Sequence, residues 1–248
     1  MMNWIVGKIV KVYNFTENLF SLIIRAPIKP FKAGQFTKLA LRINDRYIQR
    51  AYSYVNAPDD PELEFYIVSI PDGLFTSELK KLKLHDSILI KEYALGFFTI
   101  DEIPNCKDLW MLSTGTAIGP FLSILQFKKN LEKFDKIILV HAVRYKHDLS
   151  YWFLMKKLRK EYKGKLIIQS VISRENKDNS LHGRIPQLIE NRKLEECVGF
   201  KLNKKTSHIM LCGNPGMVKD TLNILKNKYD MDKHLRRKPG NITVERYW

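Results

Sequence analysis

The chain has little cysteine, little acid and no long apolar run, and each shortage excludes a class of protein. Its three cysteines, Cys106, Cys197 and Cys212, are odd in number and widely separated, so neither a disulfide framework nor a metal-binding spacing is visible. No stretch reaches the roughly 18 apolar residues that a transmembrane helix needs. Residues 4–10 already have a strand-like pattern, so we expect no signal peptide. We therefore expect a cytoplasmic protein with no membrane insertion and no bound metal.

Acidic residues are too few to balance the basic ones. The 248 residues include 42 Lys and Arg but only 26 Asp and Glu, which gives a net charge of +16. A charge of this size favours an acidic partner, which could be nucleic acid, a membrane surface or an acidic protein. Lys outnumbers Arg 30 to 12, so compositional bias is an equally good explanation. The sequence contains no nucleic-acid-binding module, and we expect no nucleic-acid partner.

The pattern of secondary structure changes at about residue 101. Before it, short runs rich in β-branched and aromatic residues are separated by Pro and Gly, which predicts an antiparallel β-barrel. The expected strands are 19–25, 35–41, 51–55, 63–70 and 87–91, with one helix at 76–82. After it, strands alternate with helices, which predicts an α/β domain with a parallel, Rossmann-like sheet. Here the expected strands are 109–113, 136–143, 166–173 and 209–212, and the expected helices are 120–131, 151–162, 186–191 and 215–229. The predicted domains are therefore 1–101 and 102–248.

Two motifs of the first domain are suited to a nucleotide. Arg50-Ala51-Tyr52-Ser53 falls on a strand, so Arg50 and Tyr52 share a face. Arginine offers a planar fork that suits a pyrophosphate, and a tyrosine ring can stack on a flat ligand. Gly73-Leu74-Phe75-Thr76-Ser77 opens a helix with Thr76 as the expected N-cap, and the free N–H groups of a helix start bind anions. A barrel strand with a surface arginine, followed by an ordinary capped helix, is the alternative.

A turn with the context of a dinucleotide site opens the second domain. Thr114-Gly115-Thr116-Ala117-Ile118-Gly119-Pro120 follows a buried-looking strand and precedes a helix. Gly115 permits close backbone approach, and Pro120 suits the first helical turn. The run differs from the common Gly-x-Gly-x-x-Gly, so a tight strand–helix turn without a ligand remains the alternative.

Arginines follow the next strands of this domain. Arg144 and the pair Ser173-Arg174 end consecutive strands, and Arg184 follows a glycine turn. Ligands of open α/β sheets bind at these carboxyl ends, where NAD sites place an acid for the ribose hydroxyl. The second strand ends instead in His141-Ala142-Val143-Arg144, which favours the 2′-phosphate of NADP(H). Solvated surface arginines are the alternative.

The end of the chain carries a further motif. Cys212-Gly213-Asn214-Pro215 ends what we expect to be the last parallel strand, and Gly216 and Asp220 follow on a helix. A buried structural cysteine is the alternative, since free thiols are commonly buried. The terminal aromatics Tyr247 and Trp248 need something to cover them.

In this order and at these separations, the motifs resemble the ferredoxin–NADP reductase family, and most closely its bacterial ferredoxin/flavodoxin–NADP reductases, over nearly the whole chain. The resemblance implies that FAD is bound in the first domain and NADP(H) in the second. It implies a set of FAD contacts: Arg50, Ala51, Tyr52, Ser53, Tyr66, Ile67, Val68, Leu74, Phe75, Thr76, Thr116, Tyr247 and Trp248. It implies a set of NADP(H) contacts: Val143, Arg144, Ser173, Arg174, Arg184, Asn214, Pro215, Gly216 and Asp220, of which the last is equally explained by a solvated helix face.

The same resemblance implies an enzyme in which Ser53 and Cys212 lie at the hydride-transfer centre. The Ser53 hydroxyl would meet flavin N5, and Cys212 would contact the nicotinamide as a positioning group without a covalent role. Hydride would pass between NADP(H) and FAD, and single electrons would pass to an acidic carrier, ferredoxin or flavodoxin. We expect a monomer. A reductase of the same fold serving free flavin, quinone or an oxygenase is the enzymatic alternative, and a basic nucleic-acid-binding module without flavin is the alternative from another class.

Overall fold

A computed structural model describes residues 3–247 of the chain. These residues form two compact units. One unit comprises the chain up to Thr99 together with Gly119–Phe127, and the other comprises Ile100–Ile118 and the chain from Lys128 onward. The predicted division into 1–101 and 102–248 assigns a cofactor to each part, and that assignment stays a prediction.

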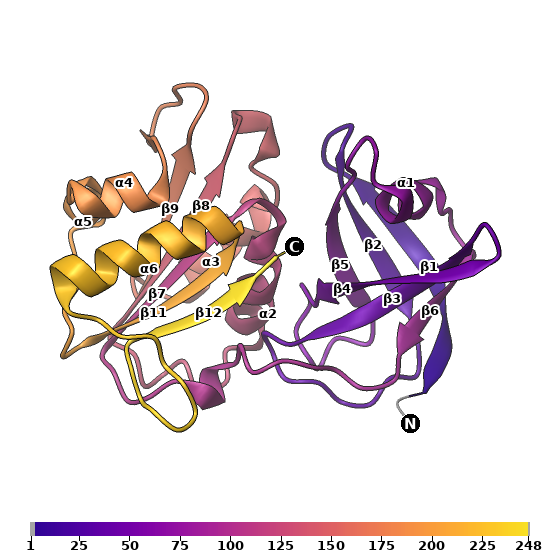
Figure 1. The fold of residues 1–248 in the computed structure, drawn as a ribbon, viewed down its shortest axis with the longest axis horizontal. Coiled ribbons are helices and arrows are strands. Elements are labelled where there is room, and N and C mark those ends of the chain that lie inside the picture. Colours follow the sequence, from indigo (N-terminus) through magenta and orange to yellow (C-terminus); the bar gives the residue numbers. More distant parts are fainter. Residues whose placement is uncertain (1–2, 248) are drawn as a thin grey trace. The chain divides into compact units, whose positions relative to one another are not determined.

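The first unit is built on an antiparallel sheet (Figure 1). Its six strands lie in the order β4-β3-β6-β1-β2-β5. Their bounds are β1 (Trp4–Asn14), β2 (Leu19–Arg25), β3 (Phe36–Ile43), β4 (Arg46–Ser53), β5 (Leu63–Val68) and β6 (Ser87–Lys91). A single bridge between Tyr54 and Phe65 links the two edges of the sheet. The predicted antiparallel barrel is thus confirmed as a half-barrel, closed at one point along its seam.

Two helices belong to the first unit. Helix α1 (Leu74–Lys81) buries Phe75 and Leu79 in the core of the half-barrel. Helix α2 (Gly119–Phe127) packs through polar contacts with the loop after β4. Ser123 Oγ donates to the Asn56 carbonyl at 2.6 Å, and Gln126 Nε2 donates to the Val55 carbonyl at 2.8 Å. The helix was expected to continue to residue 131. It ends at Phe127 because the chain then adopts the left-handed conformation, with φ of 61° at Lys128 and 62° at Asn130.

The second unit contains a parallel sheet with the strand order β10-β9-β8-β7-β11-β12. The strands are β7 (Asp108–Thr114), β8 (Lys136–Val143), β9 (Leu166–Ile172), β10 (Ser180–His182), β11 (Ser207–Gly213) and β12 (Ile242–Arg246). The helices are α3 (Trp152–Glu161), α4 (Ile185–Glu190), α5 (Lys193–Val198) and α6 (Pro215–Tyr229), with short 3₁₀ turns η1 (Ile100–Glu102), η2 (Gly115–Ile118) and η3 (Lys146–Asp148). The predicted Rossmann-like α/β architecture is confirmed.

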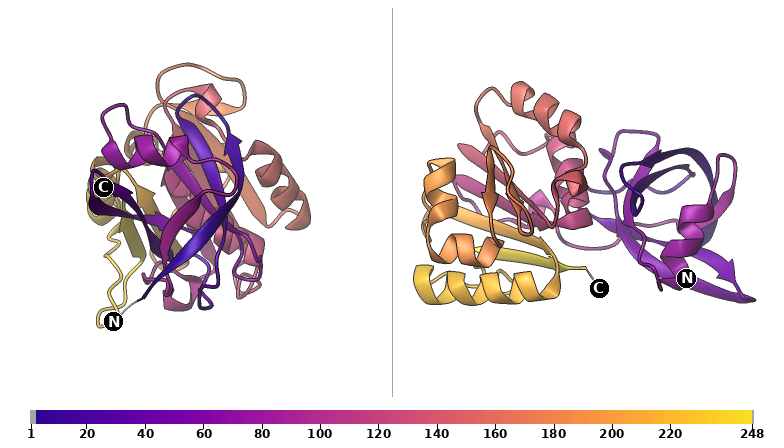
Figure 2. Two further views of the ribbon diagram at one scale, coloured as in Figure 1. Left: turned by 90° about the vertical axis from the view of Figure 1, so that its right-hand side faces the viewer. Right: turned by 90° about the horizontal axis from the view of Figure 1, so that it is seen from above.

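Helices cover both faces of this sheet, with α4, α5 and α6 on one face and α3 on the other (Figures 1 and 2). The core under α4–α6 includes Trp110, Leu112, Ile138 and Val140 from the central strands. Because both faces are buried, β8 and β11 read as nearly continuous apolar runs rather than alternating ones. None of the helices within residues 3–247 is long and apolar enough to cross a membrane.

Candidate functional site

The β4 motif and α1 lie together in the first unit. The Tyr52 ring is half-buried and stacks on Phe75, with 6.2 Å between centroids and 28° between planes. Arg50 lies two residues earlier on the same side of the strand, exposed, and donates to the Gln49 carbonyl at 2.8 Å. Burial raises the pKa of Tyr52 against a smaller opposing effect of the Arg50 charge, so its phenol stays neutral. Ala51 is exposed and Ser53 is buried. An aromatic surface therefore adjoins an exposed guanidinium.

The start of α1 differs from the predicted one. The helix begins at Leu74, its N-cap is Gly73, and no side chain caps it, so Thr76 as the N-cap was wrong. The Thr76 hydroxyl instead donates to the Gly73 carbonyl at 3.2 Å and accepts from the Ile70 N–H at 3.2 Å. A Cβ at Gly73 would lie 2.6 Å from Thr76 Oγ1, so glycine leaves room for this folded-back hydroxyl. Leu74 is exposed and Phe75 is buried.

Strand β5 supplies the next predicted contacts. Tyr66 and Ile67 are buried and Val68 is half-buried. The Tyr66 ring meets Phe15 edge-on, at 5.5 Å between centroids. Since β5 is an edge strand and its bridge to Tyr54 is at Phe65, the outer side of its backbone at residues 66–68 faces away from the ladder, which fits the predicted use of backbone groups.

The turn after β7 has the strand–turn–helix context that was predicted. It is the 3₁₀ turn η2, and α2 follows it directly. Gly115 has φ of 55°, and within residues 3–247 no atom beyond its two chain neighbours lies within 4 Å of the position of a Cβ there. A left-handed residue with open space beside it is a place where glycine allows another molecule to approach the backbone. Thr116 is buried in the turn.

The strand ends of β8 and β9 bring two of the predicted arginines together. The Arg174 N–H donates to the Arg144 carbonyl at 3.0 Å. Arg174 Nη1 donates to the Tyr145 hydroxyl at 3.1 Å, and its guanidinium lies 5.6 Å from the centre of that ring. Tyr145 in turn stacks on His147 at 5.4 Å and 7°. Both arginine side chains are exposed, so they can reach a ligand.

The other predicted residues at this edge are close by. Val143 is buried, and Ser173 is half-buried with its hydroxyl donating to the Val143 carbonyl at 3.3 Å. Arg184 is exposed and is the N-cap residue of α4, directly after β10 and Gly183. Because β8, β9 and β10 are neighbours in the sheet, the three arginines follow three adjacent strands.

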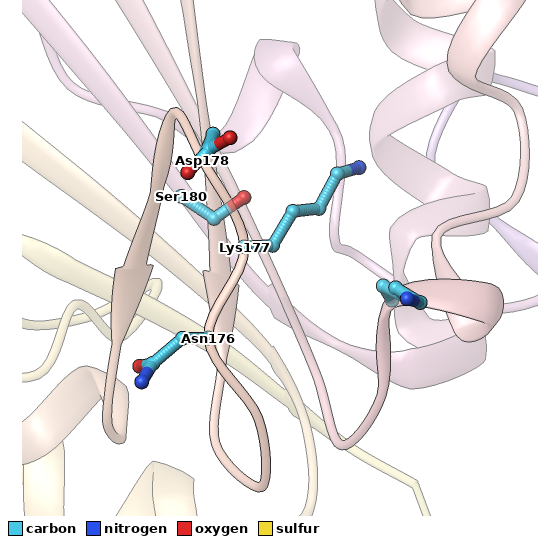
Figure 3. Close-up of a pocket in the computed structure, with 5 residues that line it drawn as sticks. Asn176, Lys177, Asp178 and Ser180 are labelled. Atoms are coloured by element: carbon cyan, nitrogen blue, oxygen red, sulfur yellow. The ribbon is translucent and has the colours of Figure 1, made fainter.

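No sequence pattern predicted the hollow that lies at this edge of the parallel sheet. Its volume is about 380 Å³, and it is lined by Lys146, Asn176, Lys177, Asp178 and Ser180. Figure 3 shows the Lys177 side chain extending away from the loop between β9 and β10. Lys146 follows Arg144 by two residues, and Lys177 follows Arg174 by three. The hollow thus adds two ammonium groups and one carboxylate to the cationic strand ends.

The motif Cys212-Gly213-Asn214-Pro215, at the end of β11, is held in place by Thr114 of β7. Gly213 has φ of 134°, and a Cβ there would lie 2.1 Å from Thr114 Oγ1. The same oxygen accepts the Asn214 N–H at 2.9 Å. Asn214 Oδ1 caps α6 by accepting the N–H groups of Gly216 and Met217 at 2.9 and 3.2 Å, and Pro215 occupies the first helical turn. Gly216 and Asp220 are exposed on α6.

Strand β11 was expected to be the last parallel strand, and that was wrong. Strand β12 pairs with it in parallel, with Glu245 opposite Cys212. The chain continues beside β11, where the Tyr247 N–H donates to the Gly213 carbonyl at 3.0 Å. Tyr247 is half-buried, and the predicted contact Trp248 lies outside the described residues.

The environment of Cys212 keeps its sulfur protonated. The thiol is fully buried and donates to Glu245 Oε1 at 3.9 Å. Burial first, and the Glu245 carboxylate second, raise the pKa of Cys212 well above its usual value. A nucleophilic cysteine requires a thiolate, so these surroundings favour the positioning role over a covalent one. Sequence reasoning missed Glu245 because it did not predict the strand that carries it.

A row of polar residues crosses the whole parallel sheet near the strand ends. Six residues lie in register on the six strands, in the spatial order Glu245, Cys212, Ser113, His141, Ser170 and Ser180. Two residues earlier on the four central strands, the corresponding row is Met210, Met111, Leu139 and Ile168. On β7, β8 and β9 this face is therefore apolar until the carboxyl ends, where ligands of such sheets bind. On β11 and β12, His208 and Thr243 are polar earlier on the same face, where they are hydrogen-bonded to each other. Within residues 3–247, no cluster of His, Cys, Asp or Glu is placed to hold a metal ion.

Comparison with known proteins places both units. Residues 10–96 match the family described as an oxidoreductase FAD-binding domain, and residues 111–223 match an oxidoreductase NAD-binding domain. The chain is 56% identical to a flavodoxin/ferredoxin–NADP reductase of Escherichia coli (strain K12), over 100% of both chains. It is 32% identical to a ferredoxin–NADP reductase of Pseudomonas aeruginosa, over 99% of this chain and 98% of that one. Its structure is similar to the crystal structure of a ferredoxin NADP⁺ reductase from Neisseria gonorrhoeae with bound FAD and NADP, with a TM-score of 0.93, 34% identity and 99% coverage of each chain.

Proposed function

The chain belongs to the flavodoxin/ferredoxin–NADP reductase family, and on that basis we propose that it transfers electrons between NADP(H) and a small acidic carrier, ferredoxin or flavodoxin, by means of bound FAD. The observation that carries this proposal is the 56% identity over the full length of a flavodoxin/ferredoxin–NADP reductase. Bound FAD supplies the redox chemistry by accepting a hydride and releasing single electrons, while the protein binds and orients the reactants.

The residues of the first unit fit FAD. Arg50 offers an exposed guanidinium for the pyrophosphate, next to the aromatic pair of Tyr52 and Phe75. The N–H groups at the start of α1 are available to the same phosphates because no side chain caps that helix. The remaining residues proposed to hold FAD are Ala51, Ser53, Tyr66, Ile67, Val68, Leu74, Thr76, Thr116, Tyr247 and Trp248. Ser53 is proposed to hydrogen-bond flavin N5.

The strand ends of the second unit fit NADP(H). Arg144, Arg174 and Arg184 follow three neighbouring strands and would bind the 2′-phosphate. On the other side of β7, at the end of β11, Gly213 places backbone that carries no side chain next to Cys212. Cys212 is proposed to contact the nicotinamide. The remaining proposed contacts are Val143, Ser173, Asn214, Pro215, Gly216 and Asp220.

The electron carrier is proposed to be acidic because the chain has a net charge of +16. Opposite charge speeds the encounter of two proteins and orients them before contact. The cytoplasmic location, the monomeric state and the division into an FAD-binding part, 1–101, and an NADP(H)-binding part, 102–248, complete the proposal.

The test is to purify the protein, identify its flavin and reduce it. We expect a yellow protein that releases FAD on denaturation, is bleached by NADPH under anaerobic conditions, and then reduces an added ferredoxin or flavodoxin. A protein that takes up FMN but not FAD, or whose bound FAD is not bleached by NADPH, would refute the proposal.

A further inference from the structure

One buried titratable side chain in the second unit has no part in the proposed contacts. His141 lies on β8, in the polar row, and is fully buried. Its Nε2 atom is 3.1 Å from the carbonyl oxygen of Gly115, in the turn that follows the neighbouring strand β7. Its Nδ1 atom is also buried and has no hydrogen-bond partner among the residues that the structure describes.

The partner of His141 fixes its protonation. A carbonyl oxygen can only accept, so the hydrogen of the neutral ring is on Nε2 and the ring donates to Gly115. Burial lowers the pKa of His141 to about 4. The side chain is therefore a neutral donor of one fixed tautomer throughout the physiological range.

Leaving Nδ1 buried without a partner costs free energy that an apolar side chain would not cost. In the row two residues earlier, this face is filled by Leu139 and its apolar neighbours. A phenylalanine would fill similar volume at position 141 and leave no orphan nitrogen. What histidine adds is a donor aimed at one particular carbonyl group.

That carbonyl belongs to the peptide that joins Gly115 to Thr116. In a trans peptide, the C=O and the following N–H point in opposite directions. Holding the Gly115 oxygen against His141, on the inside of the turn, directs the Thr116 N–H away from β8. Beside it, the Cβ position of Gly115 meets no atom within 4 Å from the described residues other than its two chain neighbours. The bond to His141 thus fixes the orientation of a peptide next to open space.

We propose that His141 is a positioning residue that locks the Gly115–Thr116 peptide so that the turn presents its N–H groups to the pyrophosphate of NADP(H). The inference rests on the proposed function, because it takes that turn as the part of the site that meets the pyrophosphate. It assigns His141 no direct contact with the ligand.

The test compares two ligands on three proteins by isothermal titration calorimetry, with the FAD-loaded enzyme. NADP⁺ contains the pyrophosphate, whereas adenosine 2′-monophosphate has the 2′-phosphate but neither phosphate of the pyrophosphate. H141F keeps a ring of similar size without the donor. H141Q places an amide N–H donor near the position of Nε2. We expect H141F to bind NADP⁺ about tenfold more weakly than the wild type, which is the effect of one hydrogen bond. Its affinity for adenosine 2′-monophosphate should stay within about twofold of wild type, and H141Q should recover most of the lost NADP⁺ affinity.

Two results would overturn the inference. One is unchanged NADP⁺ binding by H141F, and the other is an equal loss for both ligands, which would mean that His141 supports the fold and not the turn. Should H141F fail to fold, H141N gives the same comparison, because its amide nitrogen coincides with Nδ1 and falls short of the Gly115 carbonyl. A wild-type protein that binds neither ligand would instead contradict the proposed function itself.

Discussion

If the strand-end arginines bind the 2′-phosphate as proposed, the enzyme prefers NADPH over NADH. We predict that replacing Arg144 and Arg174 by alanine, singly and together, lowers the use of NADPH and leaves the use of NADH nearly unchanged. The reason is that the two dinucleotides differ only in the 2′-phosphate, which these side chains are proposed to bind. Arg174 is already oriented by its 3.1 Å hydrogen bond to the Tyr145 hydroxyl, so little entropy is lost when it binds.

The expected loss in kcat/KM depends on how exposed the two arginine side chains are to water. A charge-assisted hydrogen bond contributes about 1.5–3 kcal/mol when it is shielded from water. Both guanidinium groups are exposed, so we expect the lower value, about 1.5 kcal/mol each, or roughly a tenfold loss in kcat/KM for NADPH per substitution. The double variant should lose somewhat less than a hundredfold, because neighbouring residues that share a ligand are not additive.

The assay is steady-state reduction of an artificial acceptor with NADPH and with NADH, and the quantity compared is the ratio of the two kcat/KM values. Arg159→Ala is the matched control, since it removes an exposed arginine from α3 and should leave that ratio unchanged. An equal loss for NADH and NADPH in the Arg144 and Arg174 variants would contradict the assignment of these residues to the 2′-phosphate.

Three further predictions concern the charge, the buried histidine and the glycine beside Cys212. Electron transfer to the carrier should slow as the salt concentration rises from about 0.1 M to about 1 M, because the Debye length falls from about 10 Å to about 3 Å. Reduction of the flavin by NADPH should change less. If stopped-flow measurements show that the rate of the carrier step does not depend on salt, the proposal of an acidic partner is unsupported. Because the folded pKa of His141 is about 4, below the usual 6.5 of the unfolded chain, the unfolded state takes up its proton first, and this residue should remove about 3 kcal/mol of stability as pH falls from 6.5 to 4. In urea unfolding experiments across that range, the free energy of unfolding should depend less on pH for H141Q than for the wild type. An identical pH dependence for the two proteins would argue against a buried neutral imidazole. Gly213→Ala should destabilise the protein by about 1–3 kcal/mol or more, because its Cβ would lie 2.1 Å from Thr114 Oγ1 at a φ of 134°. A melting temperature equal to that of the wild type would refute the close approach. The control for the backbone effect alone is Gly199→Ala, at a residue with φ of 72° and open space around it.

The sequence predicted the regular elements well where a single signal dominated. Strands β2, β6 and β8 and helix α6 have the expected bounds, because continuous apolar runs or an Asn-Pro start mark them clearly. Three positive-φ glycines at the candidate sites, Gly115, Gly183 and Gly213, fall in motifs that were singled out.

The misses have physical reasons of their own. Strand β12 is short, and its burial alternates only weakly, so it becomes a strand through its pairing with β11 rather than through its own composition. Thr76 has the residue type of an N-cap, but its hydroxyl bonds backward to Gly73 and Ile70. Glu245 could be found only once β12 was placed. The hollow at Lys146 and Lys177 depends on the course of two loops, for which a sequence without periodicity gives no information.

The two units are interleaved along the chain, and this limits how such a protein can be recombined. Helix α2 lies between β7 and β8 in the sequence, yet it binds the Val55 and Asn56 carbonyls of the first unit through Gln126 and Ser123. A single genetic crossover near residue 101 would therefore join one parent's half-barrel to the other parent's α2. A chimera that exchanges the half-barrel as an intact module needs two further crossovers, one on each side of residues 119–127. Recombination between two parent genes therefore exchanges one unit alone less readily than it passes on both units together.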